Sequence, residues 1–328
     1  MTELCLGTMT FGAESDEVAS HAMLDRYVEA GGNFVDTADV YTDGAAEEIV
    51  GRWLTRSGRR DDLVIATKAR FPMGGGPNDE GISRVHLQQA CEASLRRLQV
   101  ETIDLYQAHC WDPATPIEET LDVFDALVTS GKVRHVGVSN FTGWQLQRAS
   151  LLARASGSAP IVTLQPQYSL LAREIEWELV PLCLDEGIGL LPWSPLGGGW
   201  LTGKYRRDEH PTGETRLGED PARGVEAYDK RNTAATWRVV EVVQELARVR
   251  EVSMAQVALR WVVDRPGVSS TILGTRTVEQ LEDNLAAADL RLDRDELALL
   301  DEASDPGLPA YPYGFIEEMT APRAALRA

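Results

Sequence analysis

The stretch FVDTADVY, residues 34–41, begins as an apolar run and then places an aspartate, Asp36, inside it. A short apolar run of this kind is typical of a buried strand. A buried carboxylate costs free energy unless another group pairs with it. The stretch therefore raises two questions: which side chain pairs with Asp36, and whether Tyr41, five residues later, belongs to the same site.

Similar apolar or β-branched runs recur along the chain, most of them about 30 residues apart. They begin at residues 4 (LCLGT), 33 (NFVDT), 63 (LVIAT), 103 (IDLYQA), 133 (VRHVGVS), 161 (IVTLQ), 188 (IGLLPW) and 270 (STILG). The segments between them have apolar residues three and four positions apart, as in amphipathic helices. This spacing predicts a parallel sheet, because each parallel connection needs a crossover of about this length. Eight such units predict a (β/α)8 TIM barrel, with residues 1–328 forming one domain.

An open, doubly wound sheet is the alternative to the barrel. Such a nucleotide-binding fold carries GxGxxG in its first strand-to-helix turn. Here that turn reads LGTMTFGAESD, with Gly7 and Gly12 five residues apart, so the fingerprint is absent. The last two runs start 82 residues apart, which predicts a long loop after the seventh strand, at about 195–230, and extra helices towards the C-terminus.

The overall charge narrows the choice of partners. With 32 basic and 51 acidic residues the formal net charge is −19, which argues against binding to nucleic acid or to a membrane surface. Four cysteines far apart, with no CxxC, fit a reducing compartment better than a disulfide framework. No segment approaches the ~18 apolar residues of a membrane span. We therefore expect a cytoplasmic protein, and the sequence leaves its oligomeric state open.

Charged and polar residues stand at the ends of three consecutive predicted strands. Asp36 ends the second strand, Lys68 ends the third and His109 follows the fourth, while Tyr41 lies in the loop after the second. In a (β/α)8 barrel these strand ends meet at one face, where active sites form. Taken singly, Asp36 could form a turn or a cap, Lys68 could be an ordinary lysine at a strand end, and His109 could be a loop histidine with its hydrogen bonds satisfied. Together they predict a site in which Lys68 pairs with Asp36.

A lysine beside Tyr41 predicts a tyrosine tuned as a general acid. The Lys68 cation would favour the phenolate and lower the Tyr41 pKa below its ordinary value of ~10. His109 can hydrogen-bond a substrate oxygen placed between itself and the tyrosine. This set suits protonation of a carbonyl oxygen as a hydride reaches the carbonyl carbon. A metal site is not expected, because the remaining histidines lack ligand spacing; they are His21, His86, His135 and His210.

These motifs, in this order, resemble the signatures of the aldo-keto reductases. The resemblance rests on DTADVY, ATK and LYQAHCWDP, and it continues through GKVRHVGVSNF (131–141), LQPQYSLL (164–171), PWSPLGGGWLTGKY (192–205) and GTRTVEQLEDN (274–284). Members of this family are (β/α)8 enzymes that reduce aldehydes and ketones with NADPH. The resemblance implies that Asp36, Tyr41, Lys68 and His109 are the catalytic tetrad, with Tyr41 as the acid. Family barrels usually begin with a hairpin that plugs the barrel floor, whereas this sequence reaches its first strand almost at Met1.

The glycine-rich run GGWLTGK, residues 198–204, has the spacing of a phosphate-binding P-loop. Tyr205 stands where a P-loop has Ser or Thr, which argues against an NTPase, but a glycine-rich backbone and Lys204 still suit an anion. By resemblance, this loop covers the cofactor pyrophosphate through Ser194, Pro195, Leu196, Gly198, Lys204 and Arg216. Trp193 would stack on the nicotinamide, and the residues expected to bond its carboxamide are Ser139, Asn140 and Gln165. Further expected cofactor contacts are Thr8, Met9 and Asp36.

The adenosine end of the cofactor is expected near GTRTVEQLEDN. Gly274, Thr275 and Arg276 stand at the start of a predicted helix. A helix N-terminus with an arginine suits a phosphate, which favours the 2′-phosphate of NADPH over NADH. The resemblance implies adenosine contacts from the next turns of the helix, at Gln280, Asp283 and Asn284.

The sequence therefore predicts an NADPH-dependent reductase that acts on a small-molecule carbonyl substrate. The alternative is a cofactor-binding regulatory subunit that senses redox state with little turnover, since the family includes channel-associated subunits. An isomerase or lyase acting on sugar phosphates is disfavoured, because Arg276 lies beside an adenosine-like site. Aromatic candidates for the pocket wall are Phe11, Trp53, Trp111, Trp200, Tyr311 and Tyr313.

Overall fold

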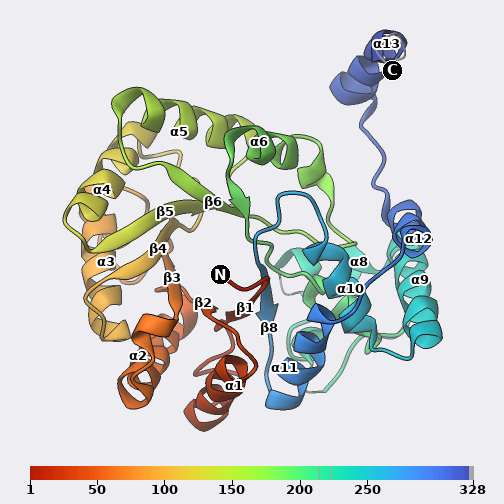
Figure 1. Cartoon of the computed structure of the whole chain (residues 1–328), viewed down its shortest axis with the longest axis horizontal. Coiled ribbons are helices and arrows are strands. Elements are labelled where there is room, and N and C mark those ends of the chain that lie inside the picture. The colour runs from red at the N-terminus through yellow and green to blue at the C-terminus, as the bar shows by residue number, and fades with distance from the viewer. Residues whose placement is uncertain (214, 223, 325–328) are drawn as a thin grey trace.

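Eight parallel strands form one curled sheet (Figure 1). The computed structural model describes residues 1–213, 215–222 and 224–324. The strands are β1 (Leu4–Gly7), β2 (Phe34–Asp36), β3 (Val64–Ala69), β4 (Ile103–Ala108), β5 (Val133–Ser139), β6 (Ile161–Gln165), β7 (Gly189–Leu190) and β8 (Thr271–Gly274). Each starts within one residue of the apolar run that predicts it.

The strands follow the order β7-β6-β5-β4-β3-β2-β1-β8, and the sheet closes where β7 meets the segment that leads into β8. The Leu190 amide donates to the carbonyl oxygen of Gly267 at 2.9 Å, and the Ser269 amide donates to the carbonyl oxygen of Leu190 at 2.9 Å. These bonds replace the long ladder that the two-residue β7 is too short to form. The predicted (β/α)8 barrel is confirmed.

Helices alternate with the strands and surround the barrel (Figure 1). The longer ones are α1 (Glu17–Glu29), α2 (Ala45–Ser57), α3 (Arg84–Leu98), α4 (Ile117–Thr129), α5 (Gly143–Ser156), α6 (Leu179–Glu186), α9 (Ala234–Arg250), α10 (Met254–Val263), α11 (Val278–Leu285), α12 (Arg294–Ser304) and α13 (Phe315–Ala324). Several begin at capping residues: the side chain of Ser83 accepts from the His86 amide, and that of Ser253 accepts from the Gln256 amide. Helices α12 and α13 are the predicted extra C-terminal helices.

Apolar side chains fill both the barrel interior and the layer between strands and helices. The interior holds Cys5, Phe34, Ala66, Leu105, Leu191 and Ile272. A larger cluster packs the outer faces of the strands against the helices, and a third surrounds Trp200 and Trp261 beside the segment after β7. Burying one such large side chain contributes about 1.5–3 kcal/mol, so these layers hold the strand ends in place.

The amino-terminal end of the barrel reaches solvent at His135. This residue pairs in register with Leu105 and is exposed, whereas Leu105 is buried. Phe34, at the start of β2, is also buried in the interior. Leu105 and Phe34 are therefore two strand side chains that help to fill this end of the barrel.

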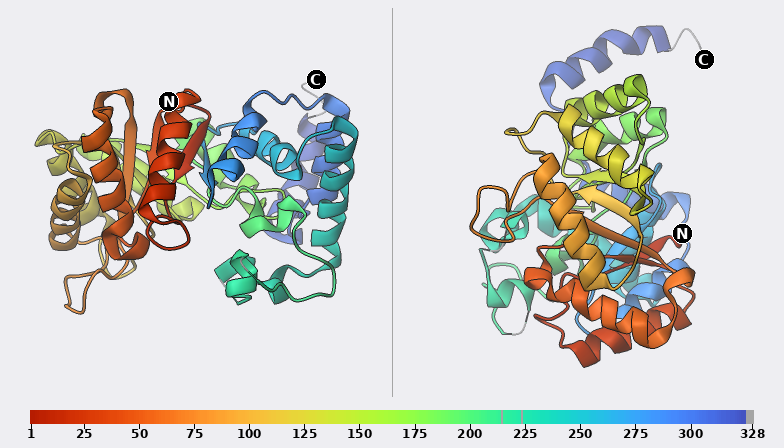
Figure 2. Two further views of the ribbon diagram at one scale, coloured as in Figure 1. Left: turned by 90° about the horizontal axis from the view of Figure 1, so that it is seen from below. Right: turned by 90° about the vertical axis from the view of Figure 1, so that its left-hand side faces the viewer.

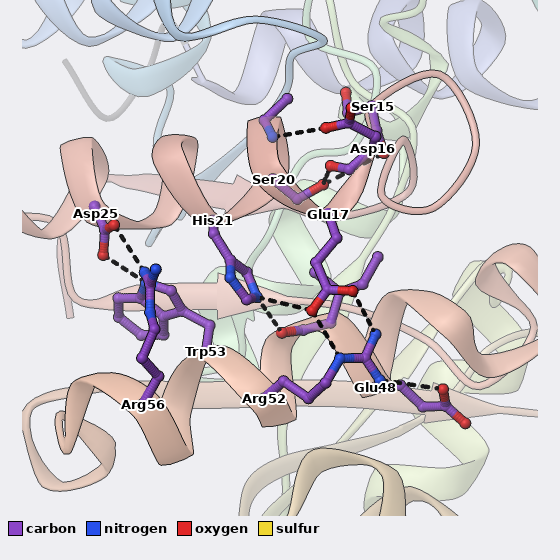
Figure 3. Close-up of polar contacts among 12 residues, drawn as sticks. Ser15, Asp16, Glu17, Ser20, His21, Asp25, Glu48, Arg52, Trp53 and Arg56 are labelled. Carbon is purple, nitrogen blue, oxygen red and sulfur yellow. Dashed lines mark hydrogen bonds and ion pairs between the residues drawn. The ribbon is translucent and has the colours of Figure 1, made fainter.

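Polar contacts join α1 to α2 (Figure 3), and one further contact links the loop before α1 to the residues before α11. Arg52 of α2 donates to Glu17 of α1 at 2.8 and 3.1 Å. Ser15, just before α1, donates from its hydroxyl to the carbonyl oxygen of Arg276 at 3.0 Å. This second contact holds the β1–α1 loop beside the residues that precede α11.

The segment after β7 lies at the carboxyl ends of the strands, below them in the left view of Figure 2. Its short helices are η4 (Gly197–Thr202), α7 (Arg216–Glu219), η5 (Gly224–Glu226) and α8 (Tyr228–Arg231). The predicted long loop is thus present and carries helical turns. At the other end of the chain, α13 stands apart from the barrel beyond α6 (Figure 1). None of the described helices is long and apolar enough to cross a membrane.

Candidate active site

A pocket of about 650 Å³ opens at the carboxyl ends of the strands. Predicted site residues line much of it: Thr8, Met9, Asp36, Tyr41, His109, Ser139, Asn140, Gln165, Trp193, Ser194, Pro195, Leu196, Gly198, Lys204, Arg216, Gly274, Arg276, Gln280, Asp283 and Asn284. Lys68 and Thr275 are buried behind this wall rather than in it. The structure therefore brings the predicted residues together at one face of the barrel.

Lys68 is the partner of Asp36. The ammonium nitrogen of Lys68 donates to Asp36 Oδ1 and to the carbonyl oxygen of Thr37, both at 2.6 Å. The other carboxylate oxygen of Asp36 accepts from Gln165 Nε2 at 2.9 Å. Lys68 Nζ also lies 3.4 Å from the Tyr41 hydroxyl and 4.9 Å from the centre of its ring. The buried aspartate in the opening stretch thus has a full set of partners, and Tyr41 contacts the same lysine.

A sharp turn after β2 places Tyr41 at the pocket. Tyr41 begins η1 (Tyr41–Gly44), in which Thr42 and Asp43 adopt left-handed φ angles of 49° and 52°. Such angles are uncommon for residues other than glycine and often occur at functional sites. The Thr42 hydroxyl donates to the carbonyl oxygen of Phe11 at 2.9 Å, which holds the turn against the β1–α1 loop.

The expected direction of the Tyr41 pKa is wrong. Burial raises the pKa of Tyr41 above its ordinary value, and it outweighs the opposing effect of the Lys68 cation. The sequence showed the lysine but not the depth of the ring. Burial also acts against the charged form of Lys68, but Asp36 and Tyr41 together raise the lysine pKa above its ordinary value. The site therefore holds a protonated phenol beside a charged lysine, and a proton donor must be protonated before it acts.

His109 faces Tyr41 across the pocket with a neutral ring. The two ring centres lie 5.9 Å apart, and Phe71 packs against the other side of the imidazole at 4.7 Å. Burial and the Lys68 cation hold the pKa of His109 well below its usual range. Among the described residues, His109 Nδ1 has no hydrogen-bond partner. A neutral imidazole at this position can hydrogen-bond a carbonyl oxygen without adding charge.

The residues expected around the nicotinamide hold one another in place. The Ser139 hydroxyl donates to the carbonyl oxygen of Gln165 at 2.8 Å. Asn140 Nδ2 donates to the carbonyl oxygen of His109 at 3.0 Å, and Asn140 Oδ1 accepts from Trp193 Nε1 at 3.1 Å. This chain of bonds ties the ends of β4, β5 and β6 to the tryptophan that precedes the glycine-rich turn.

Cations gather at the far end of the pocket, where the cofactor phosphates are expected. Lys204, Arg216 and Arg276 all line it. Burial, then Arg276 and Arg216, lowers the pKa of Lys204, so these side chains repel one another. The Gly198 amide donates to Ser194 Oγ at 3.1 Å within the same turn. An anion would relieve this repulsion, so the residues present fit the phosphate groups of a dinucleotide.

The aromatic residues expected in the pocket wall lie elsewhere. Phe11, Trp53 and Trp200 are buried in the packed layers, because their rings fill space between helices and strands. Trp111 packs edge-on against Phe141. Tyr311 is exposed, and the other tail residue, Tyr313, donates to Glu178 at 2.6 Å on the barrel's outer side.

Several lining residues were missed by the sequence reasoning. They include Thr10, Glu14, Val40, Phe71, Thr202, Thr215, Ser253, Ala255 and Leu259. Two of them had a usable signal, because Glu14 follows Met9 in the same strand-to-helix loop and Phe71 stands three residues after Lys68. The direction in which a loop side chain points depends on the turn, which the residue pattern does not show.

A second carboxyl of the opening stretch, Asp39, lies outside the pocket. It is fully buried, and neither oxygen has a hydrogen-bond partner among the described residues. Burial and then the nearby carboxylate of Glu47 raise the pKa of Asp39 to about 7. Glu47 itself is paired with Arg97 at 2.6 Å. Asp36 thus pairs with a lysine and accepts a further hydrogen bond, whereas the Asp39 carboxyl, three residues later, is buried without a hydrogen-bond partner among the described residues.

Comparison with known proteins agrees with this geometry. The sequence model of the Aldo/keto reductase family matches residues 3–305. The uncharacterized oxidoreductase YrpG of Bacillus subtilis (strain 168) is 37% identical over 311 residues, covering 92% of this chain and 92% of that protein. Norsolorinic acid reductase of Aspergillus flavus is 32% identical over 333 residues, covering 97% and 81%. A probable voltage-gated potassium channel subunit beta of Arabidopsis thaliana is 36% identical over 291 residues, covering 86% and 85%. The chain therefore belongs to the aldo/keto reductase family, a family of oxidoreductases that generally use nicotinamide cofactors.

Proposed function

We propose that this protein is an NADPH-dependent reductase that converts aldehydes or ketones to alcohols. The observation that carries the proposal is the position of Lys68, whose ammonium lies 2.6 Å from Asp36 Oδ1 and 3.4 Å from the Tyr41 hydroxyl. A protonated phenol held there, at the wall of a pocket, suits the delivery of a proton to a carbonyl oxygen. When bound, NADPH supplies the hydride that the carbonyl carbon accepts.

Each member of the tetrad has a distinct part in this proposal. Tyr41 gives its hydroxyl proton to the substrate oxygen. Lys68, kept charged by Asp36, stabilises the phenolate that remains. His109, neutral at physiological pH, hydrogen-bonds the same oxygen and so orients the carbonyl between itself and Tyr41. Val40 and Phe71 also line the pocket and add apolar surface to its wall.

The preference for NADPH is inferred from charge. Lys204 and Arg216 would meet the pyrophosphate, and Arg276, just before α11, suits the 2′-phosphate. The stacking and carboxamide contacts would come from Trp193, Asn140 and neighbouring side chains. Four free cysteines fit a reducing compartment, which supports a cytoplasmic location.

A redox-sensing regulatory subunit is the second candidate. It is favoured by the likeness to a protein named as a probable voltage-gated potassium channel subunit beta. In that case the same pocket would hold the cofactor, and turnover would be slow. The presence of Asp36, Tyr41, Lys68 and His109 in one connected arrangement supports the reductase instead.

The test combines cofactor binding with turnover. NADPH and NADH are titrated by fluorescence, and NADPH absorbance is then followed with a panel of aldehydes, ketones and sugar carbonyls. The reductase proposal expects tight NADPH binding and oxidation of NADPH with at least one class of carbonyl. Tight binding without turnover across the panel favours the regulatory subunit. Failure to bind either nucleotide overturns both candidates.

A further inference from the structure

Arg276 does not stand alone at the far end of the pocket, because two carboxylates of the described part of the chain, Glu219 and Glu14, contact it. Glu219, the last residue of α7, accepts from Arg276 through both oxygens, at 2.9 and 2.8 Å. Glu14, in the β1–α1 loop, accepts from the same guanidinium at 3.4 Å. The pairs join three separate parts of the chain: the loop after β1, the segment after β7 and the approach to α11.

These ion pairs are partly shielded from water. The side chains of Arg276 and Glu14 are 21% and 15% exposed, and that of Glu219 is 41% exposed. Glu219 first, then burial acting in the opposite direction, sets the Arg276 pKa, which is raised above its ordinary value. The bidentate pair uses the fork of the guanidinium that a phosphate would also use.

We propose that Glu219 and Glu14 determine how strongly the protein prefers NADPH over NADH. This inference rests on the proposed function. A 2′-phosphate would have to replace Glu219 on the Arg276 fork, and it would then lie beside Glu14, which lines the pocket. A nucleotide without that phosphate leaves the Arg276–Glu219 pair intact. The two carboxylates therefore weaken the binding of NADPH but not that of NADH, and so reduce the difference in affinity between the two cofactors.

Two variants that each replace a carboxylate by a neutral amide measure this competition through binding alone, without turnover. The Kd values of NADPH and NADH are determined by equilibrium fluorescence titration for the wild type, Glu219→Gln and Glu14→Gln. Glu219→Gln should raise the ratio of the NADH Kd to the NADPH Kd about fivefold, because a partly exposed ion pair is worth up to ~1 kcal/mol. Glu14→Gln should raise the same ratio by a smaller factor. Since both nucleotides are titrated on one preparation, any unfolded fraction affects both alike.

Glu282→Gln is the matched control. It removes one negative charge from α11, where Glu282 pairs with Arg26 rather than with Arg276, so its ratio should stay at the wild-type value. A ratio that is unchanged in both Glu219→Gln and Glu14→Gln, in a protein whose wild type binds NADPH, overturns this inference and leaves the reductase proposal standing. A wild type that binds neither nucleotide overturns both.

Discussion

The two ends of the pocket hold their charges in different ways. At the inner end, Lys68 and Asp36 are buried and pair with each other inside the barrel. At the outer end, Arg276 pairs with Glu219 of α7 and with Glu14 of the β1–α1 loop, and these side chains keep some contact with water. A buried pair is costly to break, whereas a partly exposed pair exchanges partners at little cost. The buried pair at the inner end is therefore suited to holding catalytic groups in one arrangement. The partly exposed pairs at the outer end are suited to exchanging a carboxylate for a ligand phosphate.

Removing the acid at the inner end should have the largest effect. Tyr41→Phe deletes the hydroxyl that gives the proton and keeps the ring, so kcat should fall by about 10²–10⁴. The Kd of NADPH should change less than about twofold, since the hydroxyl contributes to chemistry rather than to the phosphate end. Tyr313→Phe, on the outer side of the barrel, is the control and should keep full activity. Substantial turnover by Tyr41→Phe would remove the tyrosine from its proposed role.

Breaking the buried ion pair should destabilise the fold. Lys68→Met leaves Asp36 buried without its cation, which is expected to cost about 3–5 kcal/mol in the free energy of unfolding measured with urea. Adding Asp36→Asn to that variant should recover part of the loss, because the uncompensated charge is then gone. The exposed pair of Lys132 and Glu92 provides the comparison, and Lys132→Met should cost less than ~1 kcal/mol. Equal losses at both lysines would contradict the contrast between buried and exposed pairs.

Asp39 should make stability depend on pH. The pKa of Asp39 in the folded protein, about 7, lies above the unfolded value of ~3.9. The protonated carboxyl therefore adds its full contribution to the free energy of unfolding below about pH 4, and this contribution is lost as the pH rises to about 7. Asp39→Asn removes that loss. The difference in unfolding free energy between variant and wild type should therefore grow, in favour of the variant, by about 3–4 kcal/mol between pH 4 and pH 8. A difference that stays flat over this range would show that Asp39 is already ionised or well paired.

Removing the arginine at the outer end should give the smallest effect of the four. Arg276→Ala deletes the proposed 2′-phosphate contact, so NADPH should bind about tenfold more weakly, equivalent to ~1.4 kcal/mol. The affinity for NADH should fall by less than about threefold. Arg26→Ala, which removes an exposed arginine paired with Glu282, should leave both Kd values unchanged. Equal weakening of the two nucleotides by Arg276→Ala would place the 2′-phosphate elsewhere.

The barrel could be predicted because each strand carries its own signal. The runs at residues 4, 103, 133 and 161 start where β1, β4, β5 and β6 start, and the remaining four differ by one residue. Even the two-residue β7 was marked by the apolar run IGLLPW. The strand-end residues followed from the same logic, since parallel strands bring their carboxyl ends to one face.

Properties that depend on depth and turn geometry could not be predicted. The pKa of Tyr41 depends on how far the ring is buried, and the sequence showed only that a lysine was near. Glu14 and Phe71 stand close in sequence to predicted site residues, but whether their side chains reach the pocket depends on how their loops turn, which no residue pattern shows. Phe11 and Trp200 lie in the core because packing, not sequence position, decides where a large ring fits.

The central claim is direct hydride transfer to a carbonyl carbon beside Tyr41. The most direct test uses NADPH carrying two deuterium atoms at C4 of the nicotinamide, a carbonyl substrate found on the panel, and mass spectrometry of the alcohol. The account predicts one deuterium on the former carbonyl carbon and none on the hydroxyl, with the label transferred by the wild type and little transferred by Tyr41→Phe. An alcohol without deuterium on that carbon would contradict it.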